Sequence, residues 1–432
     1  QPIMLNKFKS IIAKSKDKGN FFVSVKSLEE LKYFNSAKQI FSTLENEDKN
    51  AKFMFVGGCV RKLLSREQIK DIDIATNLSP EKIKKILNQN NIKFFETGIS
   101  HGTITVINNG YKFEITTLRK DVATDGRHAD VEFISDWEVD AQRRDFTINA
   151  VYSNLRGEIF DPLEGAKDLK KGIVKFIGDS DKRIKEDYLR ILRYLRFYTQ
   201  YSKKEHDAET IKAIKRNLNG VIKISKERIL DELFKILELS NLNDLFDNEF
   251  TRSIISSIFP QLKNYGRINI LNKISNQVLA KLDAVLVLSI LLIDSSDNCE
   301  YFLYKFNLSN KNKKRILFLQ NNFRRIFFKS KLNENELLKL AYSNDKKAAI
   351  DLLIFSIFVN HDIDFNLIEK QISFIENSQI PIFPIEADFL KLQYGFSESR
   401  ELGMALMKLE EFWINNSFQI DKKKVQNILK LK

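Results

Sequence analysis

Several residue types are scarce in this 432-residue chain, and each scarcity excludes a class of protein. The two cysteines, Cys59 and Cys299, lie too far apart in sequence to form a zinc motif or a disulfide framework. Only four histidines are present, whereas a histidine-based metal centre would need several close together. No uncharged apolar run approaches the roughly 20 residues of a membrane span. We therefore expect oxygen rather than sulfur or nitrogen to bind any metal, no membrane contact, and a cytoplasmic location.

Glycine is common only in the first part of the chain, because eleven of the 15 glycines precede residue 180. Alternating apolar patterns occur there too, as at 101–108 and 111–118, which Asn109-Gly110 joins in a typical two-residue hairpin. Beyond about residue 180 the apolar spacing is helical, as at 183–199, 225–238 and 281–293. The sequence therefore predicts an α/β head with a small mixed sheet, followed by an all-α remainder.

The net charge is +13, which favours a partner that carries many phosphates. One basic stretch, residues 311–331, interleaves positive charges with phenylalanines, and its charged candidates are Lys313, Lys314, Arg315, Arg324 and Arg325. These residues are consistent either with a helical hairpin whose charges face solvent or with a patch that grips an RNA backbone without reading its sequence.

The stretch 53–75 has the order expected of a phosphate-binding turn beside a metal site. A short apolar strand ends at Gly57-Gly58, where the chain can turn tightly and let a phosphate approach the backbone, and Arg61 follows about one helical turn later. Asp71 and Asp73 then alternate with isoleucines, so both carboxylates project from one face of a strand. Such a pair suits Mg²⁺ bridged to substrate phosphates, although a solvated strand face would also explain it.

Two further segments carry charges that suit a nucleotide or its metal ions. Arg143, Arg144, Asp145 and Asn149 fall in a predicted helix, where the guanidinium groups would bind phosphate oxygens; an exposed helix with a local Arg–Asp pair is the alternative. Glu114, on the predicted strand 111–118, is either a third carboxylate of the metal site or an edge-strand acid.

A long amphipathic helix predicted over 183–199 carries four charged residues spaced by three: Asp187, Arg190, Arg193 and Arg196. The carboxylate of Asp187 accepts hydrogen bonds and the guanidinium of Arg190 donates them. Together they complement the base edges of cytosine and adenine, whereas uracil and guanine present the reverse order. This pair is therefore expected to select CTP and ATP.

Taken together, these motifs resemble the class II nucleotidyltransferases, which include bacterial CCA-adding enzymes and bacterial poly(A) polymerases. The resemblance spans about 53–237 and places the family's Gly-Gly-x-Val-Arg motif at Gly57 to Arg61 and its metal-binding D-x-D at Asp71 and Asp73. The family's Arg-Arg-Asp-Phe-Thr-x-Asn motif falls on 143–149 and its nucleotide-selecting E-D-x-x-R on 186–190, with Arg193 and Arg196 at nucleotide-contacting positions. Lys62 stands where many relatives have Asp.

The resemblance implies a template-independent enzyme that adds C, C and A to tRNA 3′ ends from CTP and ATP and releases pyrophosphate by two-metal catalysis. Two Mg²⁺ ions are implied, with Mn²⁺ as an alternative. The segment 119–130 resembles the family's flexible loop, associated with the switch from C to A addition; its candidates are Arg119, Asp121, Asp125, Gly126 and Arg127. Four alternatives stay open: a poly(A) polymerase, a CC-adding enzyme, an A-adding enzyme and a non-catalytic RNA-binding protein.

The expected organisation has four regions: an N-terminal helical extension (1–50), a catalytic head (51–160), a helical neck with the nucleotide-selecting helix (161–245) and a helical body and tail that bind tRNA (246–432). We expect the protein to act as a monomer.

Overall fold

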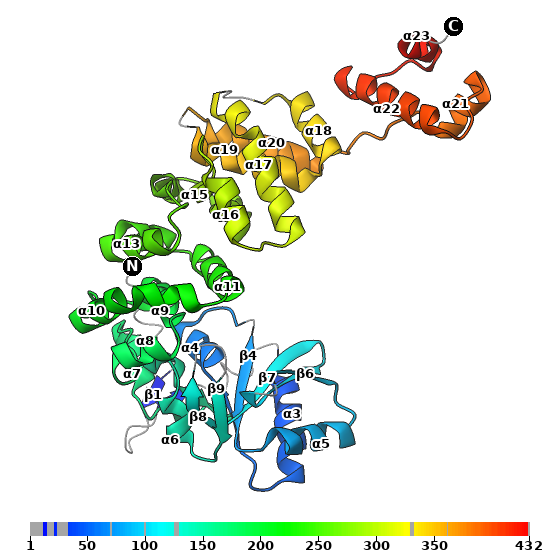
Figure 1. Ribbon diagram of the computed structural model, residues 1–432. Coiled ribbons are helices and arrows are strands. Elements are labelled where there is room, and N and C mark those ends of the chain that lie inside the picture. The colour runs from blue at the N-terminus through cyan, green and yellow to red at the C-terminus, as the bar shows by residue number, and fades with distance from the viewer. Residues whose placement is uncertain are drawn as a thin grey trace. The chain divides into compact units, whose positions relative to one another are not determined.

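The computed structural model describes residues 12–14, 21–23, 33–69, 71–98, 101–124, 129–328, 332–360 and 362–430. The chain divides into two units, residues 1–245 and 246–432. Figure 1 follows the first unit from the strands and helices in blue and cyan to the helices in green. None of the helices in the described ranges is both long and apolar enough to cross a membrane.

Within the described part of the first unit, seven strands form one mixed sheet in the order β11-β10-β3-β4-β7-β6-β5. Their bounds are β3 Phe53–Val56, β4 Ile72–Thr76, β5 Phe94–Gly98, β6 Thr103–Asn108, β7 Tyr111–Thr117, β10 Tyr152–Ser153 and β11 Ile159–Phe160. β4 runs parallel to β7 and antiparallel to β3. The hairpin between β6 and β7 turns at Asn109 and Gly110, both with positive φ, as the sequence predicts.

The two faces of this sheet have different chemistry. Ile72 and Ile74 of β4 are buried in a core with Phe113 and Ile115 of β7, and α3 (Phe34–Glu47) and α5 (Pro80–Gln89) pack on the same side. Because side chains alternate along a strand, Asp73 points to the opposite face. The expected mixed sheet is thus confirmed, and its second face is covered only in part, by a small core that includes Ala75 and Ala141, which leaves room for a site beside Asp73.

The N-terminal part differs from the helices expected over 1–50. Residues 12–14 (β1, Ile12–Lys14) pair with 21–23 (β2, Phe21–Val23). The helix α3 buries Ile40, Phe41 and Leu44, and Phe41 lies 5.3 Å from Phe55 of β3 between ring centroids. This helix therefore contributes to the core of the head.

Smaller elements complete the first unit. They are α4 (Gly58–Ser65), α6 (Trp137–Gln142), a second strand pair β8 (Arg119–Thr124) and β9 (Ala129–Phe133), and the helices α7 (Gly165–Lys171), α8 (Ser180–Glu186), α9 (Arg190–Tyr201), α10 (Ala208–Asn217), α11 (Lys226–Leu237) and α12 (Leu242–Asp247), which runs into the second unit; short 3-10 turns are η2 (Thr147–Asn149) and η3 (Leu218–Lys223).

Two helix predictions in this unit need correction. The helix predicted over 183–199 is two helices, since residues 187–189 interrupt it: Asp187 is extended and its carboxylate accepts a hydrogen bond from the N–H of Leu189, which starts the turn into α9. The helix predicted to carry Arg143 to Asn149 ends at Gln142 instead, and only residues 147–149 form a 3-10 turn.

The described part of the second unit is helical, as predicted, and includes the expected helix near 281–293 as α15. Its elements are α13 (Glu249–Ile258), η4 (Tyr265–Asn272), α14 (Asn276–Leu279), α15 (Ala284–Leu292), α16 (Asn298–Lys305), α17 (Asn310–Phe328), α18 (Glu334–Ser343), α19 (Lys346–Val359), α20 (Phe365–Asn377), α21 (Ala387–Tyr394), α22 (Arg400–Asn415), η5 (Lys422–Lys424) and α23 (Val425–Leu429). Every residue of α15 is buried, which makes it the centre of this unit.

Candidate active site

A cavity of about 820 Å³ lies over the open face of the sheet in the first unit. Its lining brings together nearly all the residues that the sequence singled out for nucleotide binding: Gly57, Gly58, Arg61, Asp73, Arg143, Arg144, Asp145, Asn149, Asp187, Arg190, Arg193 and Arg196. Segments separated by more than a hundred residues in sequence thus meet in one space. Asp71 and Glu114 do not line it.

The turn at Gly57 positions the start of α4 beside the aspartate strand. Gly57 has φ +68°, a conformation that favours glycine, and its N–H donates to the carbonyl oxygen of Val151. A Cβ on Gly58 would lie 3.9 Å from the Asp73 carboxylate. This distance is an ordinary van der Waals contact, so it is the positive φ of Gly57 that requires glycine in this turn.

Asp73 is a carboxylate that lacks a compensating charge in direct contact. Within the described residues it forms no ion pair, and burial, together with the charge of neighbouring Glu114, raises its pKa to about 6 despite Arg144. Glu114 lies directly across from Asp73 in the parallel β4–β7 pair, and its own carboxylate binds Lys112 at 2.7 Å. Asp71, just before β4, is exposed.

No group of three acidic, histidine or cysteine side chains in the described ranges is arranged to hold a metal ion alone. The residues nevertheless fit a cation whose other ligands are phosphate oxygens and water, because the half-buried Asp73 and nearby Asp71 supply negative charge and form no ion pair within the described ranges.

Asp140, which the sequence reasoning missed, holds both arginines of the 143–144 pair. Its carboxylate is 1% exposed and accepts hydrogen bonds from Arg143 Nε (2.9 Å), Arg144 Nη2 (3.0 Å) and the hydroxyl of Tyr152 (2.7 Å). Burial alone would raise the pKa of Asp140, but the charges of Arg144 and Arg143 outweigh it and lower the pKa to about 2. The spacing of three and four residues to the arginines was the available signal.

Asp145 links this segment to the neck. It accepts hydrogen bonds from Asn149 Nδ2 (2.9 Å) and from Arg193 Nε of α9 (2.6 Å), and although burial opposes it, Arg193 and Asn149 hold its pKa well below the usual range. Asn149 in turn accepts a hydrogen bond from Arg61, whose guanidinium lies 4.5 Å from the centre of the Phe197 ring.

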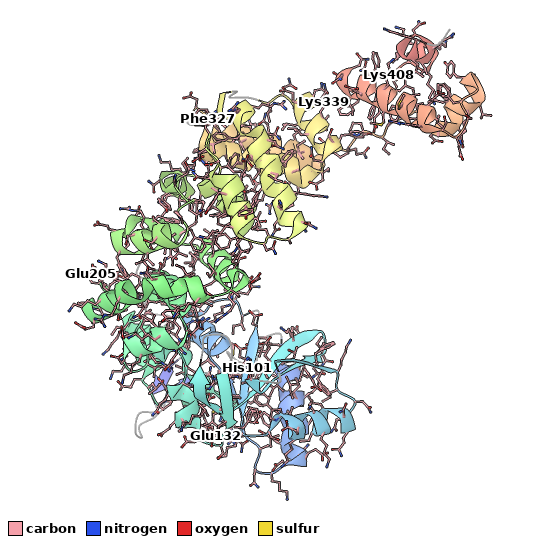
Figure 2. All side chains as sticks on the ribbon, viewed as in Figure 1. His101, Glu132, Glu205, Phe327, Lys339 and Lys408 are labelled. Carbon is pink, nitrogen blue, oxygen red and sulfur yellow. The ribbon has the colours of Figure 1, made fainter. Side chains whose placement is uncertain are left out.

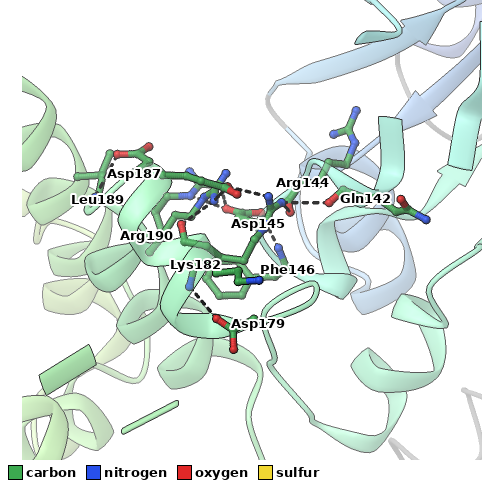
Figure 3. A network of polar contacts seen from close by, with 12 residues as sticks. Gln142, Arg144, Asp145, Phe146, Asp179, Lys182, Asp187, Leu189 and Arg190 are labelled. Carbon is green, nitrogen blue, oxygen red and sulfur yellow. Dashed lines mark hydrogen bonds and ion pairs between the residues drawn. The ribbon is translucent and has the colours of Figure 1, made fainter. Parts of the chain in front are cut away.

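The predicted base-reading residues have different partners. Asp187 binds Arg228 Nη2 of α11 at 2.7 Å, and Arg190 binds Glu186 and donates to the carbonyl oxygen of Arg183 at 2.7 Å. Figure 3 shows Asp187, Leu189 and Arg190 beside the segment that carries Arg144 and Asp145. Arg228 also lines the cavity, whereas the sequence predicted only a helix over this segment (225–238).

Two other residues act as connectors. Arg183 donates to the carbonyl oxygens of Gln142 (3.1 Å) and Arg144, which joins α8 to the arginine segment. Arg196 binds Glu232 of α11, whose side chain is 1% exposed, so much of its charge is already paired inside the neck.

The structure describes only two of the five flexible-loop candidates. Arg119 and Asp121 lie on β8 and line the cavity, whereas Asp125, Gly126 and Arg127 lie outside the described residues.

The basic patch of the second unit is smaller than expected. Arg315 is largely buried and binds Asp351 (2.9 Å) and Asp283 (2.6 Å), so it is part of an internal ion-pair network rather than of an open patch. Arg325 pairs with Glu336 at 3.0 Å. Lys313, Lys314 and Arg324 are exposed on α17.

Two known protein families match parts of this chain. The family described as "Poly A polymerase head domain" matches residues 53–175, and "Probable RNA and SrmB- binding site of polymerase A" matches 206–265. The mitochondrial CCA tRNA nucleotidyltransferase 1 of Homo sapiens is 33% identical over 396 residues, which cover 88% of this chain and 87% of that protein. This chain belongs to the CCA tRNA nucleotidyltransferase family.

Two bacterial CCA-adding enzymes also match this chain in sequence or structure. The CCA-adding enzyme of Lactobacillus helveticus is 42% identical over 205 residues, covering 47% of this chain and 50% of that protein. The solved structure of the Bacillus stearothermophilus CCA-adding enzyme in complex with CTP has a TM-score of 0.69 at 23% identity and covers 93% of this chain and 98% of that one, which shows a common fold. The chain is thus a nucleotidyltransferase with the fold that the sequence predicted.

Proposed function

We propose that this protein is a template-independent nucleotidyltransferase that adds C, C and A to the 3′ ends of tRNA from CTP and ATP. The observation that carries the proposal is the single cavity that holds Gly57, Gly58 and Asp73 together with Asp187 and Arg190. A phosphate-binding part and a base-reading part therefore share one space, where side chains rather than a template strand meet the base. Related structures contain tRNA, ATP or CTP, which supports the same substrates here.

The residues divide the work as follows. Arg143 and Arg144, held by Asp140, bind the triphosphate oxygens, and Arg61 adds positive charge beside the Gly-Gly turn. Asp187 accepts a hydrogen bond from the amino group of cytosine or adenine, while Arg190 donates one to the neighbouring ring nitrogen. A base with the reverse order leaves buried polar groups unpaired, which penalises UTP and GTP.

Asp71 and Asp73 would hold the divalent cations, two Mg²⁺ ions or Mn²⁺ in their place. When bound, these ions lower the pKa of the attacking 3′-hydroxyl and neutralise charge on the departing pyrophosphate. The half-buried carboxylate of Asp73 lies near Arg144, which is proposed above to bind the triphosphate. Glu114 is a neighbour that adds negative charge from β7 rather than a residue of the cavity wall.

One assay tests the proposal. The protein is incubated with Mg²⁺, CTP and ATP and either tRNA that lacks its 3′ CCA or an unstructured oligo(A). Addition of three residues to the tRNA, with little extension of oligo(A), is expected. Long tails on oligo(A) would identify a poly(A) polymerase instead, and arrest after CC or failure to start without CC would identify the partial activities.

Three variants test the site. Asp71→Asn and Asp73→Asn are each expected to reduce incorporation by at least a thousandfold while tRNA binding changes little, since they remove cation ligands and not RNA contacts. Asp187→Ala is expected to raise incorporation of UTP relative to CTP. Unchanged discrimination in that variant would contradict the base-reading role. A monomeric state and a cytoplasmic location stay predictions, which sedimentation and cell fractionation would test.

A further inference from the structure

The cavity also extends from Asp73 over β7 and β6, on the side of β4 opposite the Gly-Gly turn. This second end is lined by His101, Thr103, Thr116, Arg119 and Asp121. His101, labelled in Figure 2, directly precedes Gly102, the residue before β6, so the group is built by the sheet and by the start of β8. The proposed nucleotide contacts do not use this end, although it belongs to the same space.

The order of the strands fixes where this end lies relative to the aspartate. Across the sheet the order is β3, β4, β7, β6. The Gly-Gly turn follows β3, Asp73 is on β4, Thr116 is on β7 and Thr103 is on β6. Thr103 pairs with Thr116, and Thr116 pairs with Ala75, two residues after Asp73, so these side chains share the face of Asp73. Asp73 thus lies between the phosphate turn and the threonine pair.

Phosphoryl transfer requires the attacking and leaving oxygens to lie roughly in line on opposite sides of the phosphorus. The arginines and the Gly-Gly turn would hold the leaving pyrophosphate on the β3 side. The attacking hydroxyl must then arrive from the β7 and β6 side. Resting on the function proposed above, we propose that Thr103, Thr116 and Arg119 bind the 3′-terminal nucleotide of the RNA that is extended.

The chemistry of this end suits a ribose with its phosphate. The hydroxyl oxygens of Thr103 and Thr116 lie 2.9 Å apart, and each hydroxyl both donates and accepts, as the 2′-hydroxyl of a ribose does. Arg119 supplies positive charge for the phosphate that precedes this ribose. Its guanidinium is held in place by a hydrogen bond to the carbonyl oxygen of His101 and lies 3.7 Å from Asp121. Two neutral hydroxyls beside one guanidinium, whose charge Asp121 partly balances, thus match a nucleotide with a single phosphate better than a triphosphate.

The test is the double variant Thr103→Val/Thr116→Val, which removes both hydroxyls and keeps the side-chain volume. With tRNA ending in CC and ATP as substrates, KM for the tRNA is expected to rise about tenfold, the equivalent of about 1.4 kcal/mol of lost hydrogen bonding, while KM for ATP stays unchanged. The preference of the wild type for a terminal ribose over a terminal 2′-deoxyribose is expected to shrink in the same variant. Thr103→Ser/Thr116→Ser, which keeps the hydroxyls, is expected to behave as the wild type.

Thr117→Val is the matched control, because Thr117 follows Thr116 on β7 but donates to the carbonyl oxygen of Leu78 and does not line the cavity. It is expected to lower thermal stability without changing either KM. If the double variant does not fold, the two single variants are measured, each with an expected rise of about threefold in KM for tRNA.

A rise in KM for ATP alone, or no change in either constant, would overturn the inference. Because the wild type is assayed alongside, failure of the proposed function is seen separately, as absence of A addition by the unaltered protein.

Discussion

At the scale of single residues, the buried carboxylate of Asp140 is the most connected group of the site. It binds Arg143, Arg144 and the hydroxyl of Tyr152, and one of its oxygens also accepts the N–H of Arg119 at the start of β8 (3.3 Å). Removing its charge leaves two arginines without their partner, and breaking a buried ion pair from one side is costly. The arginines proposed to bind triphosphate therefore depend on a residue that need not touch the nucleotide.

Asp140→Asn is expected to lower the free energy of unfolding by about 3 kcal/mol at pH 7 and to raise KM for CTP and ATP more than it lowers kcat. The pKa of Asp140, about 2, lies below that of an unfolded carboxyl, so its stabilisation is complete above about pH 4 and is lost as the pH falls toward 2. The difference between wild type and variant should then be constant from about pH 5 to 8 and shrink below about pH 4.

Urea unfolding at several pH values measures this difference. Asp136→Asn is the matched control, since Asp136 caps the start of α6 by accepting from the N–H groups of Glu138 and Val139, and asparagine caps equally well. A loss of stability in the control as large as that in Asp140→Asn would show that the ion pairs are not its cause.

Gly57 offers a prediction that separates backbone strain from function. Its φ of +68° penalises any side chain, so Gly57→Ala is expected to cost about 1–3 kcal/mol of stability and to raise KM for ATP by displacing the start of α4. Gly110→Ala is matched to it, because Gly110 has φ +79°, an equally unfavourable backbone, but lies in the hairpin turn with open space around its Cβ position. Steady-state kinetics measure KM for ATP in both variants. An equal rise in the two would exclude a specific role of Gly57 in nucleotide binding.

At the scale of elements, the site depends on the interruption between α8 and α9. The sequence hides it because Leu189, Leu192 and Leu195 form an apolar stripe of helical spacing that begins within the break, and neither glycine nor proline marks it. The break turns Asp187 toward α11, where Arg228 meets it across 41 positions of sequence. The spacing of residues along one helix singled out Asp187 and Arg190. Such spacing cannot reveal a partner on another helix, as Arg228 is for Asp187.

The local elements were more predictable than their contacts. The Gly-Gly turn, the aspartate strand and the Asn109-Gly110 hairpin depend on neighbours in sequence, and each formed as expected. By contrast, the internal ion pairs of Arg315 and Arg196 are formed with buried acids 36 positions away, although Arg196 also lines the cavity. Charge alone does not reveal whether an arginine faces solvent or an acid on another helix.

Arg228→Gln tests the contact between α11 and Asp187. Without Arg228, the Asp187 carboxylate loses its ion pair and its fixed orientation, so discrimination of CTP against UTP is expected to fall about five- to tenfold, in line with a loss near 1 kcal/mol. Arg216→Gln is the control, since Arg216 also pairs with an aspartate of α8, Asp181, but does not line the cavity. Competition between CTP and UTP in single-turnover assays measures both; an equal loss in the control would contradict a specific role for Arg228.

At the scale of the whole molecule, the positive charges are paired differently in the two units. In the first unit much of the cavity's arginine charge is paired with acids that orient it, as with Arg193 and Asp145. In the second unit Lys313, Lys314 and Arg324 are exposed on one helix, and no acid in the described residues pairs with them. Arginines held in place by acids suit a small ligand bound in one orientation. Exposed, unpaired cations suit an extended polyanion such as tRNA, which is bound through its phosphates.

The triple variant Lys313→Ala/Lys314→Ala/Arg324→Ala is therefore expected to weaken tRNA binding at least tenfold and to reduce the dependence of log K on log salt concentration by about one for each lost phosphate contact. KM for CTP should not change, because the cavity lies in the other unit. A matched variant, Lys49→Ala/Lys52→Ala/Lys85→Ala, removes three exposed charges from the head and is expected to leave the salt dependence nearly unaltered. Binding titrations at several salt concentrations distinguish the two: equal slopes for both variants would mean that net charge, rather than this surface of α17, holds the RNA.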